Sequence, residues 1–248
     1  MRPGRCLLGV CVLVMSIAAA CSNDTDDRSP LVDPPASRFA PGGAELPAWL
    51  EPHPTETFEV SSEVFGYLGP FADPAQGEAF AREQGYQDGY RAQFHPDGQL
   101  AGVASGDQFY LTVETYLLAS DESAETVYAL FEDRYGETEG SQGASADQLG
   151  NRSSAWQFAE GTVGDTEIEA TYYGFIFQRG NIVGVVQIYG AADGISAGTA
   201  RDVALIMDER ILGEREAVPP TPAGSDTPGG GELPGMDDDA PLPGQGGE

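Results

Sequence analysis

Apart from its acids, this chain of 248 residues offers few side chains that could carry catalysis. It holds two His and three Cys, and all 12 of its basic residues are Arg. Without Lys it cannot use a phosphate-binding loop lysine or a Schiff base. His53 lies between two prolines and His95 begins a His-Pro-Asp-Gly turn, so neither is expected to act in catalysis. The sequence predicts no catalytic residue, no cofactor and no metal site.

Carboxylate pairs are the one catalytic device that this composition leaves open. Glycoside hydrolases use two acids that converge on one bond, and expected strands carry Glu114, Glu167 and Glu169. In a chain with 40 acids such pairs arise by chance, so exposed strand positions are the preferred explanation. A pocket that unites Glu114 with Glu167 or Glu169 would favour a hydrolase, and an open aromatic sheet face would favour a binding protein.

Aromatic side chains on the expected strands supply the candidate ligand-binding residues. Alternation along a strand would place several of them on a sheet face that the helices leave open. Aromatic rings edged by polar groups suit sugar, peptide or protein surfaces. The alternative is that most of these rings pack in the core or at the sheet edges. The candidates are Tyr110, Tyr116, Trp156, Tyr172, Tyr173 and Tyr189.

The charge of the chain excludes one class of partner. Its 12 Arg stand against 40 acids, which gives a net charge of −28. Nucleic acids and anionic membrane surfaces are bound by clustered cations. We therefore expect no nucleic-acid partner and no electrostatic adhesion to a membrane.

The N-terminus has the pattern of an export signal. Arg2 and Arg5 precede an uncharged apolar run over residues 6–20, which ends in Ala18-Ala19-Ala20-Cys21. At ~1.5 Å per residue the run spans roughly 22 Å, less than the ~30 Å hydrocarbon core of a bilayer. This length fits a cleaved signal peptide better than a membrane-spanning helix.

This ending resembles the lipobox of bacterial lipoproteins, although Ala18 stands where that family usually has Leu. The resemblance implies cleavage before Cys21 and attachment of diacylglycerol to its thiol. The chain would then be held on the extracytoplasmic face of the cell membrane, with the membrane as a partner through the lipid. Cys21 would be the only Cys left after cleavage, and a lone Cys has no internal disulfide partner. An ordinary secretory signal is the alternative, because Ala-x-Ala is also a general cleavage site.

Composition divides the rest of the chain into three parts. Residues 21–54 are rich in Pro and are expected to form a tether behind the signal peptide of residues 1–20. Residues 214–248 are rich in Pro, Gly and acids and are expected to be a disordered tail. The globular domain is therefore predicted over residues 55–213.

Two helices of this domain share one spacing of apolar positions. Ser120 is a good N-cap, and the apolar positions after it fall at i, i+3, i+4, i+7 and i+11. The same spacing recurs 76 positions later and ends at Ile211. Each helix follows a run of strand type, over residues 109–117 and 182–190, and each run follows a Gly-Asp or Gly-Asn turn.

These patterns predict two βββα repeats, over about residues 88–136 and 152–212, with an extra helix over 73–85. The predicted fold is α+β: one antiparallel sheet with its helices on one face, a two-layer sandwich. The sequence favours a non-catalytic binding, sensor or accessory domain that contacts an envelope protein or glycan. An envelope hydrolase with paired carboxylates and a structural spacer are the alternatives.

Overall fold

The computed structural model describes residues 31–69, 71–96, 100–163 and 166–216, so the predicted signal peptide, Cys21 and the tail beyond Glu216 lie outside it. Eight strands form one antiparallel sheet. They are β1 (Leu50–Pro52), β2 (Phe58–Glu59), β3 (Asp88–Pro96), β4 (Tyr110–Leu117), β5 (Gln142–Gly143), β6 (Arg152–Thr162), β7 (Glu169–Arg179) and β8 (Ile182–Ala191). Their order is β1-β3-β4-β8-β7-β6-β5, and β2 also pairs with β3.

Five α-helices surround this sheet within the described residues: α1 (Ser62–Leu68), α2 (Pro74–Glu83), α3 (Leu100–Ala104), α4 (Asp121–Glu137) and α5 (Ala197–Ile211). Ser120 caps α4 and Ser196 caps α5, because each hydroxyl accepts a hydrogen bond from a backbone N–H of the first turn. The extra helix predicted over 73–85 is confirmed as α2, which Asp73 caps. Short 3-10 turns lie at η1 (Ala36–Phe39), η2 (Gly43–Glu45) and η3 (Ala192–Gly194).

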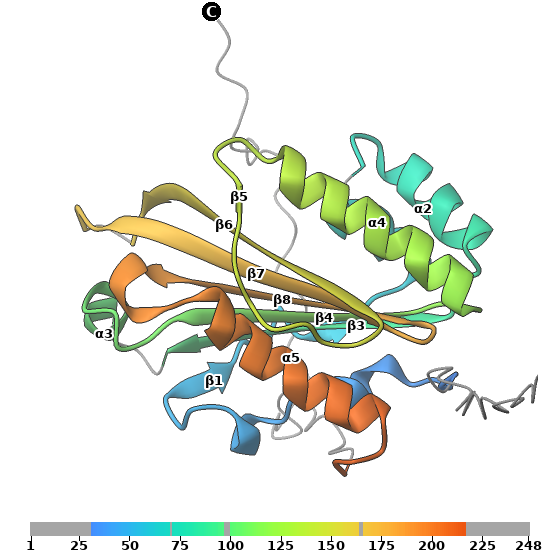
Figure 1. The fold of residues 1–248 in the computed structure, drawn as a ribbon, viewed down its shortest axis with the longest axis horizontal. Helices are drawn as coiled ribbons and strands as arrows, with labels where there is room; N and C mark the ends of the chain where they lie inside the picture. The colour runs from blue at the N-terminus through green and yellow to red at the C-terminus, as the bar shows by residue number, and fades with distance from the viewer. Residues whose placement is uncertain (1–30, 70, 97–99, 164–165, 217–248) are drawn as a thin grey trace, which may run out of the picture.

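The α+β class and the antiparallel sheet are confirmed, but the helices do not share one face. Helix α5 packs with Phe175 and Phe177, whereas α4 packs with Ile176, and successive residues of a strand point to opposite faces. Figure 1 shows α4 and α2 on one side of the sheet and α5 on the other. The face of each helix could not be predicted, because β7 and β8 are apolar on both sides. The expected two-layer sandwich is thus corrected to a sheet with helices on both faces.

This arrangement also corrects the predicted repeat. Strands β4 and β8 are antiparallel neighbours, with β3 outside β4 and β7 outside β8. A rotation of 180° about an axis perpendicular to the sheet superposes β3–β4 on β7–β8 and does not exchange the two faces of the sheet. If the two units were true copies, their helices would therefore lie on one face. Because α4 and α5 lie on opposite faces, the two units have opposite hands. The first unit also has the short helix α3 where a middle strand was expected.

Residues 31–52, predicted as tether, instead form a strap that packs on the α5 side of the sheet. Ala36, Phe39 and Leu50 of this strap are each at most 4% exposed. The Asn181 side chain makes two hydrogen bonds with the backbone of Val32, at 2.9 and 3.0 Å. Residues 31–52 therefore belong to the folded domain, which was predicted to begin at residue 55.

A buried ion pair holds the middle of the strap. The Arg210 side chain, on α5, is fully buried and donates hydrogen bonds to the Ala40 carbonyl and the Glu45 carboxylate. Burial lowers the pKa of Arg210, and the adjacent Glu45 opposes this effect by favouring the charged guanidinium. Arg215 pairs with the other carboxylate oxygen of Glu45, at 3.2 Å. The strap is thus bound to the C-terminal helix by charge as well as by apolar packing.

Candidate functional site

The sheet face that carries α4 presents rows of side chains that follow the strand register. One row crosses β4, β8, β7 and β6 as Tyr110, Tyr189, Tyr172 and Phe158. Successive ring centroids lie 5.2, 4.8 and 4.8 Å apart, and we call this row the tyrosine ladder. The rings of Tyr172 and Phe158 are nearly parallel, at 3°. Because the rings stack on one another, they offer edges rather than open ring faces to a ligand. The three tyrosines also pack against a small buried apolar cluster, and the Tyr189 hydroxyl donates to the Thr162 carbonyl at 3.5 Å.

The structure divides the six aromatic candidates into three groups. Tyr110, Tyr172 and Tyr189 lie together on the ladder and are partly exposed. Tyr116 and Trp156 lie on the same face but are buried in the cluster beneath α4, at 0% and 4% exposure. Tyr173 packs against the core on the α5 face. Only the ladder members therefore remain accessible to a ligand on this face.

A second row lies beside the ladder and is polar. It runs from Gln93 on β3 through Thr112 on β4 to Gln187 on β8, and we call it the polar row. All three residues are partly exposed, and none of their side chains makes a hydrogen bond with another described residue. Free amide and hydroxyl groups in line on a strand face are available to a polar ligand. This row was not predicted, because strand alternation alone does not give the register between strands.

A pocket of about 290 Å³, here called the α4 pocket, adjoins both rows. It is lined by Leu68, Arg91, Glu114, Phe131, Arg134, Tyr135, Thr138, Phe158, Glu160 and Gln187. It thus shares Gln187 with the polar row and Phe158 with the ladder. The ladder, the polar row and the α4 pocket together form one open strip on this face.

The inner wall of the pocket is a buried network of charges. Arg91 on β3 pairs with Glu114 opposite it on β4, and the Tyr116 hydroxyl donates to the second carboxylate oxygen of Glu114 at 2.7 Å. The Glu114 side chain is 9% exposed, so these bonds compensate its desolvation. Arg91 keeps one buried N–H, at Nε, without a partner among the described residues. The network fixes the position of Arg91 and leaves it a donor to spare.

Two opposite charges lie among the exposed residues of the pocket lining. Arg134 lies in the last turn of α4, where a cation is favoured by the helix dipole, and Glu160 lies on β6. Neither forms an ion pair with another described residue. Their charged atoms therefore lie beyond the ~4 Å reach of an ion pair. No sequence motif links these two residues, which only the fold brings to one pocket.

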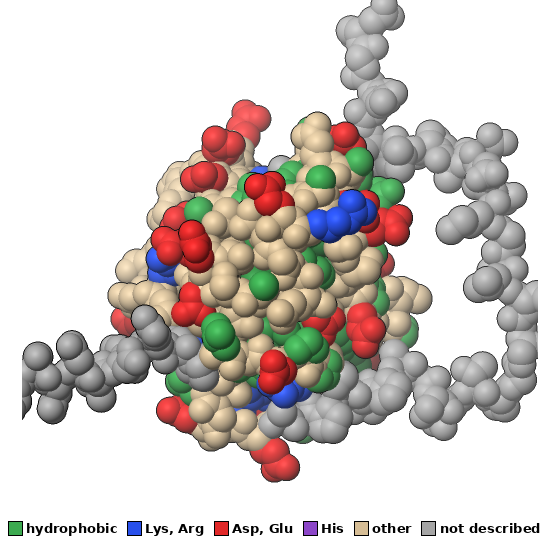
Figure 2. All heavy atoms as spheres, turned by 90° about the vertical axis from the view of Figure 1, so that its right-hand side faces the viewer, with side chains coloured by type: hydrophobic (Ala, Val, Ile, Leu, Met, Phe, Trp, Pro, Cys, Tyr) green, Lys and Arg blue, Asp and Glu red, His purple; other side chains and the backbone are tan. Residues whose placement is uncertain are grey.

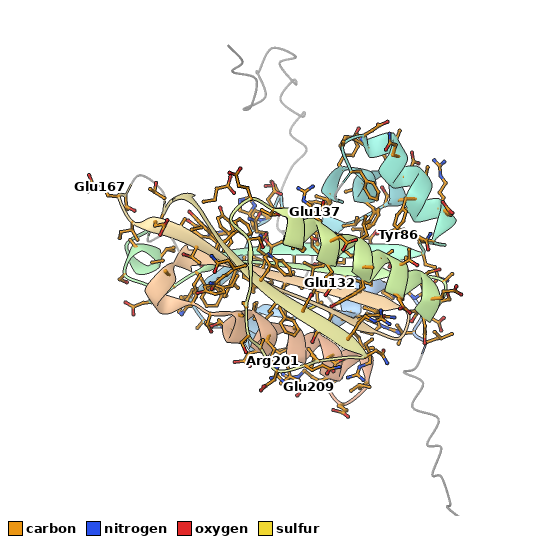
Figure 3. All side chains as sticks on the ribbon, turned by 45° about the horizontal axis from the view of Figure 1, so that its top comes forward. Tyr86, Glu132, Glu137, Glu167, Arg201 and Glu209 are labelled. Carbon is orange, nitrogen blue, oxygen red and sulfur yellow. The ribbon has the colours of Figure 1, made fainter. Side chains whose placement is uncertain are left out.

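The pocket does not unite the three acids that a hydrolase was expected to use. Glu114 lines it, but Glu167 and Glu169 are exposed near the β6–β7 connection. Figure 3 shows Glu167 at the outer tip of the sheet, away from α4. Glu114 is already bound by Arg91 and Tyr116, which stabilise it as an acceptor. Glu114 thus shares the pocket with Glu160 rather than with Glu167 or Glu169, and the pair that would favour a hydrolase is not formed there.

Burial of tyrosines around this face predicts a loss of stability in alkali. Burial raises the pKa of Tyr116 and Tyr135, with nearby Glu114 adding to it, and raises that of Tyr128 to about 12. The unfolded chain loses these protons near pH 10, before the folded chain does. We therefore expect these tyrosines to contribute fully to the free energy of unfolding below about pH 10, and this contribution to be lost as the pH rises above it.

The measurement is urea denaturation at a series of pH values from 8 to 11.5. Tyr135→Phe keeps the ring that stacks on Trp156 and should make the fall less steep. Tyr67→Phe, at a tyrosine that is 68% exposed, is the matched control. A free energy of unfolding that stays constant up to pH 11.5 would contradict the expectation.

Acidic side chains outnumber basic ones on the face that Figure 2 shows. They are scattered over this face, with few basic ones among them. In the described part of the chain, no three His, Cys, Asp or Glu side chains are grouped to hold a metal ion. None of the helices in those ranges is long and apolar enough to cross a membrane.

Comparison with known proteins gives only remote likenesses. No family model and no curated protein matches the chain. The extracellular domain of PknH from Mycobacterium tuberculosis is 10% identical, with a TM-score of 0.47, covering 73% of this chain and 98% of its own. LpqN, involved in cell envelope biogenesis in the same organism, is 22% identical, with a TM-score of 0.27, covering 48% of this chain and 68% of its own. At these TM-scores neither likeness carries an argument about this chain.

Proposed function

We propose that this chain is a non-catalytic binding or accessory module of the cell envelope, anchored outside the cytoplasmic membrane by a lipid on Cys21. Its ligand lies on the open strip. The observation that carries the proposal is the polar row, whose side chains have no partners in the described structure and which adjoins a pocket with a charged rim. Polar groups held in line by a rigid sheet are suited to selective recognition.

The charge of the chain narrows the chemistry of the ligand. Without residues 1–20 the chain holds 10 Arg and 40 acids, a net charge of −30. Such a field repels polyanions and attracts cations, and it does not oppose neutral or zwitterionic molecules. The same field opposes direct adhesion to an anionic bilayer, so a covalent lipid is the suitable means of attachment.

The lipid anchor is tested by Cys21→Ser in cells. We expect the variant to lose metabolic labelling with fatty acid and to leave the membrane fraction completely, because no other thiol remains after cleavage. Continued labelling of Cys21→Ser would refute the anchor.

The strip is tested in the same cells with a photo-crosslinking residue at Thr112. We expect a crosslinked product there that Gln187→Arg removes, because the arginine would fill the neighbouring position of the polar row. The matched control is the same crosslinker at Ala129, an exposed position of α4. Equal products at both positions, or products insensitive to Gln187→Arg, would refute the strip as the ligand site.

A further inference from the structure

We propose that the α4 pocket binds a small zwitterion of the amino-acid type, with a free carboxylate and a free ammonium group. The inference rests on the proposed function, because it names the ligand class of part of the open strip. It is argued from the unpaired charges of the pocket, from its unpartnered donors and from its volume.

The carboxylate of the ligand is received by arginine. Arg134 has no ion pair within the described ranges and lines the pocket together with Arg91, whose guanidinium is already paired with Glu114. A guanidinium presents parallel N–H donors that match the two oxygens of a carboxylate. Gln187 adds an amide whose N–H groups are free of bonds to described residues. The pocket therefore offers several donors to one anionic group.

The ammonium group of the ligand is received by Glu160. This acid lines the same pocket and has no ion pair with a described residue. Since Arg134 and Glu160 do not reach each other, a molecule with both charges can bridge them. A ligand with one charge would leave the opposite rim charge without a partner.

The volume of the pocket limits the ligand to a small molecule. It is about 290 Å³, at the lower end for ligand pockets, which suits a single amino acid such as leucine. Most of the lining is polar, and Phe131 is only 2% exposed, so the apolar contact comes from Leu68 and Phe158. These two side chains would contact the side chain of the ligand while the two rim charges hold its backbone groups.

The experiment compares leucine with three blocked forms on the full-length chain in detergent. Leucine amide lacks the carboxylate charge, N-acetylleucine lacks the ammonium, and N-acetylleucine amide lacks both. Titration calorimetry gives the affinities, and the tryptophan emission, which comes from Trp49 and from the Trp156 that stacks on Tyr135, reports occupancy. We expect leucine to bind at least about tenfold more tightly than each blocked form, because a hydrogen bond to a charged group is lost.

Two variants assign the ends of the ligand. Arg134→Gln should weaken leucine and N-acetylleucine but leave leucine amide unchanged, and Glu160→Gln should weaken leucine and leucine amide but leave N-acetylleucine unchanged. The matched controls are Arg82→Gln on α2 and Glu167→Gln at the outer tip of the sheet, which should behave as the wild type. Circular dichroism of every variant confirms that it is folded.

Equal affinities for all four compounds, no binding of any of them, or equal effects of the two variants on both singly charged forms would overturn the inference. Such a result together with an intact crosslink at Thr112 would leave the proposed function standing. The crosslink at Thr112 could instead be lost while leucine still binds in a charge-selective way. That result would overturn the strip as the ligand site and leave the pocket as the binding site of the zwitterion.

Discussion

Glu45→Ala is expected to lower the free energy of unfolding by about 3–5 kcal/mol, because it leaves a buried charge without a partner. The Arg210 side chain is 0% exposed and Glu45 is its carboxylate partner. In the variant, Arg210 would retain its bond to the Ala40 carbonyl, but no anion would neutralise it. The strap would separate from α5 to allow water to reach the guanidinium. Urea denaturation measures the loss, and limited proteolysis within the strap reports the separation.

Two further variants test whether the loss comes from the unpaired charge of Arg210. Glu51→Ala changes an exposed acid of the same strap, on β1, and should alter the stability by less than about 0.5 kcal/mol. The double variant Glu45→Leu with Arg210→Leu removes both charges and should recover most of the loss, as buried pairs replaced by apolar residues commonly do. A loss below about 1 kcal/mol for Glu45→Ala would show that the pair contributes little to holding the strap.

Trp156→Ala should destabilise the protein by about 3–5 kcal/mol, as expected of a large side chain removed from a core. The indole is 4% exposed and stacks on Tyr135 with ring centroids 3.6 Å apart. It also covers Gly174 on β7, where an added Cβ would lie 1.8 Å from the indole. This close approach explains why β7 carries glycine at that position. The variant would leave a cavity beneath α4 and remove one face of the stack.

Tyr110→Ala is the comparison that separates the ladder from the core. Tyr110 is partly exposed at one end of the ladder, so its loss should cost about 1 kcal/mol, the scale of a cross-strand pair. Urea denaturation of both variants gives the two values. If Tyr110→Ala unfolds as readily as Trp156→Ala, the ladder is part of the core and is not an accessible surface.

Local elements could be predicted from the sequence where one physical signal dominated. The apolar spacing after Ser120 and the hydroxyl cap determine α4, and the unbroken apolar run of β8 marks a strand covered on both faces. Residues 100–104 were harder, because an apolar run this short suits a strand or a helix equally well. A middle strand was therefore predicted in the first unit, where the structure has the helix α3.

The strap was not predicted, because its proline-rich composition is typical of a free linker. Prolines spaced along residues 30–54 indicate an extended chain, and extended chains can be free or docked. Phe39, Leu46 and Leu50 are the signal that could have shown docking, since a solvated tether has no need of large apolar side chains. Their burial has no period, so no helical or strand pattern revealed it.

The site was predictable only in part, because the register between strands cannot be derived from the sequence. Alternation placed Tyr110, Tyr172 and Tyr189 on strand faces, but the alignment of those strands made them a ladder. The pocket depends on contacts between distant elements: Arg91 comes from β3, Arg134 from α4 and Glu160 from β6. Residues that share no motif give no signal in the sequence that the fold brings them into one pocket.

The strap also determines the order in which this protein can complete its fold. Val32 and its partner Asn181 are 149 positions apart, and Ala40 and Arg210 are 170 positions apart. A chain made from its N-terminus therefore produces the strap first and its binding partners last. Until α5 has emerged, Phe39 and Leu46 have no complete surface on which to pack. The strap is thus synthesised before its partners and can complete its docking only after α5 has been made.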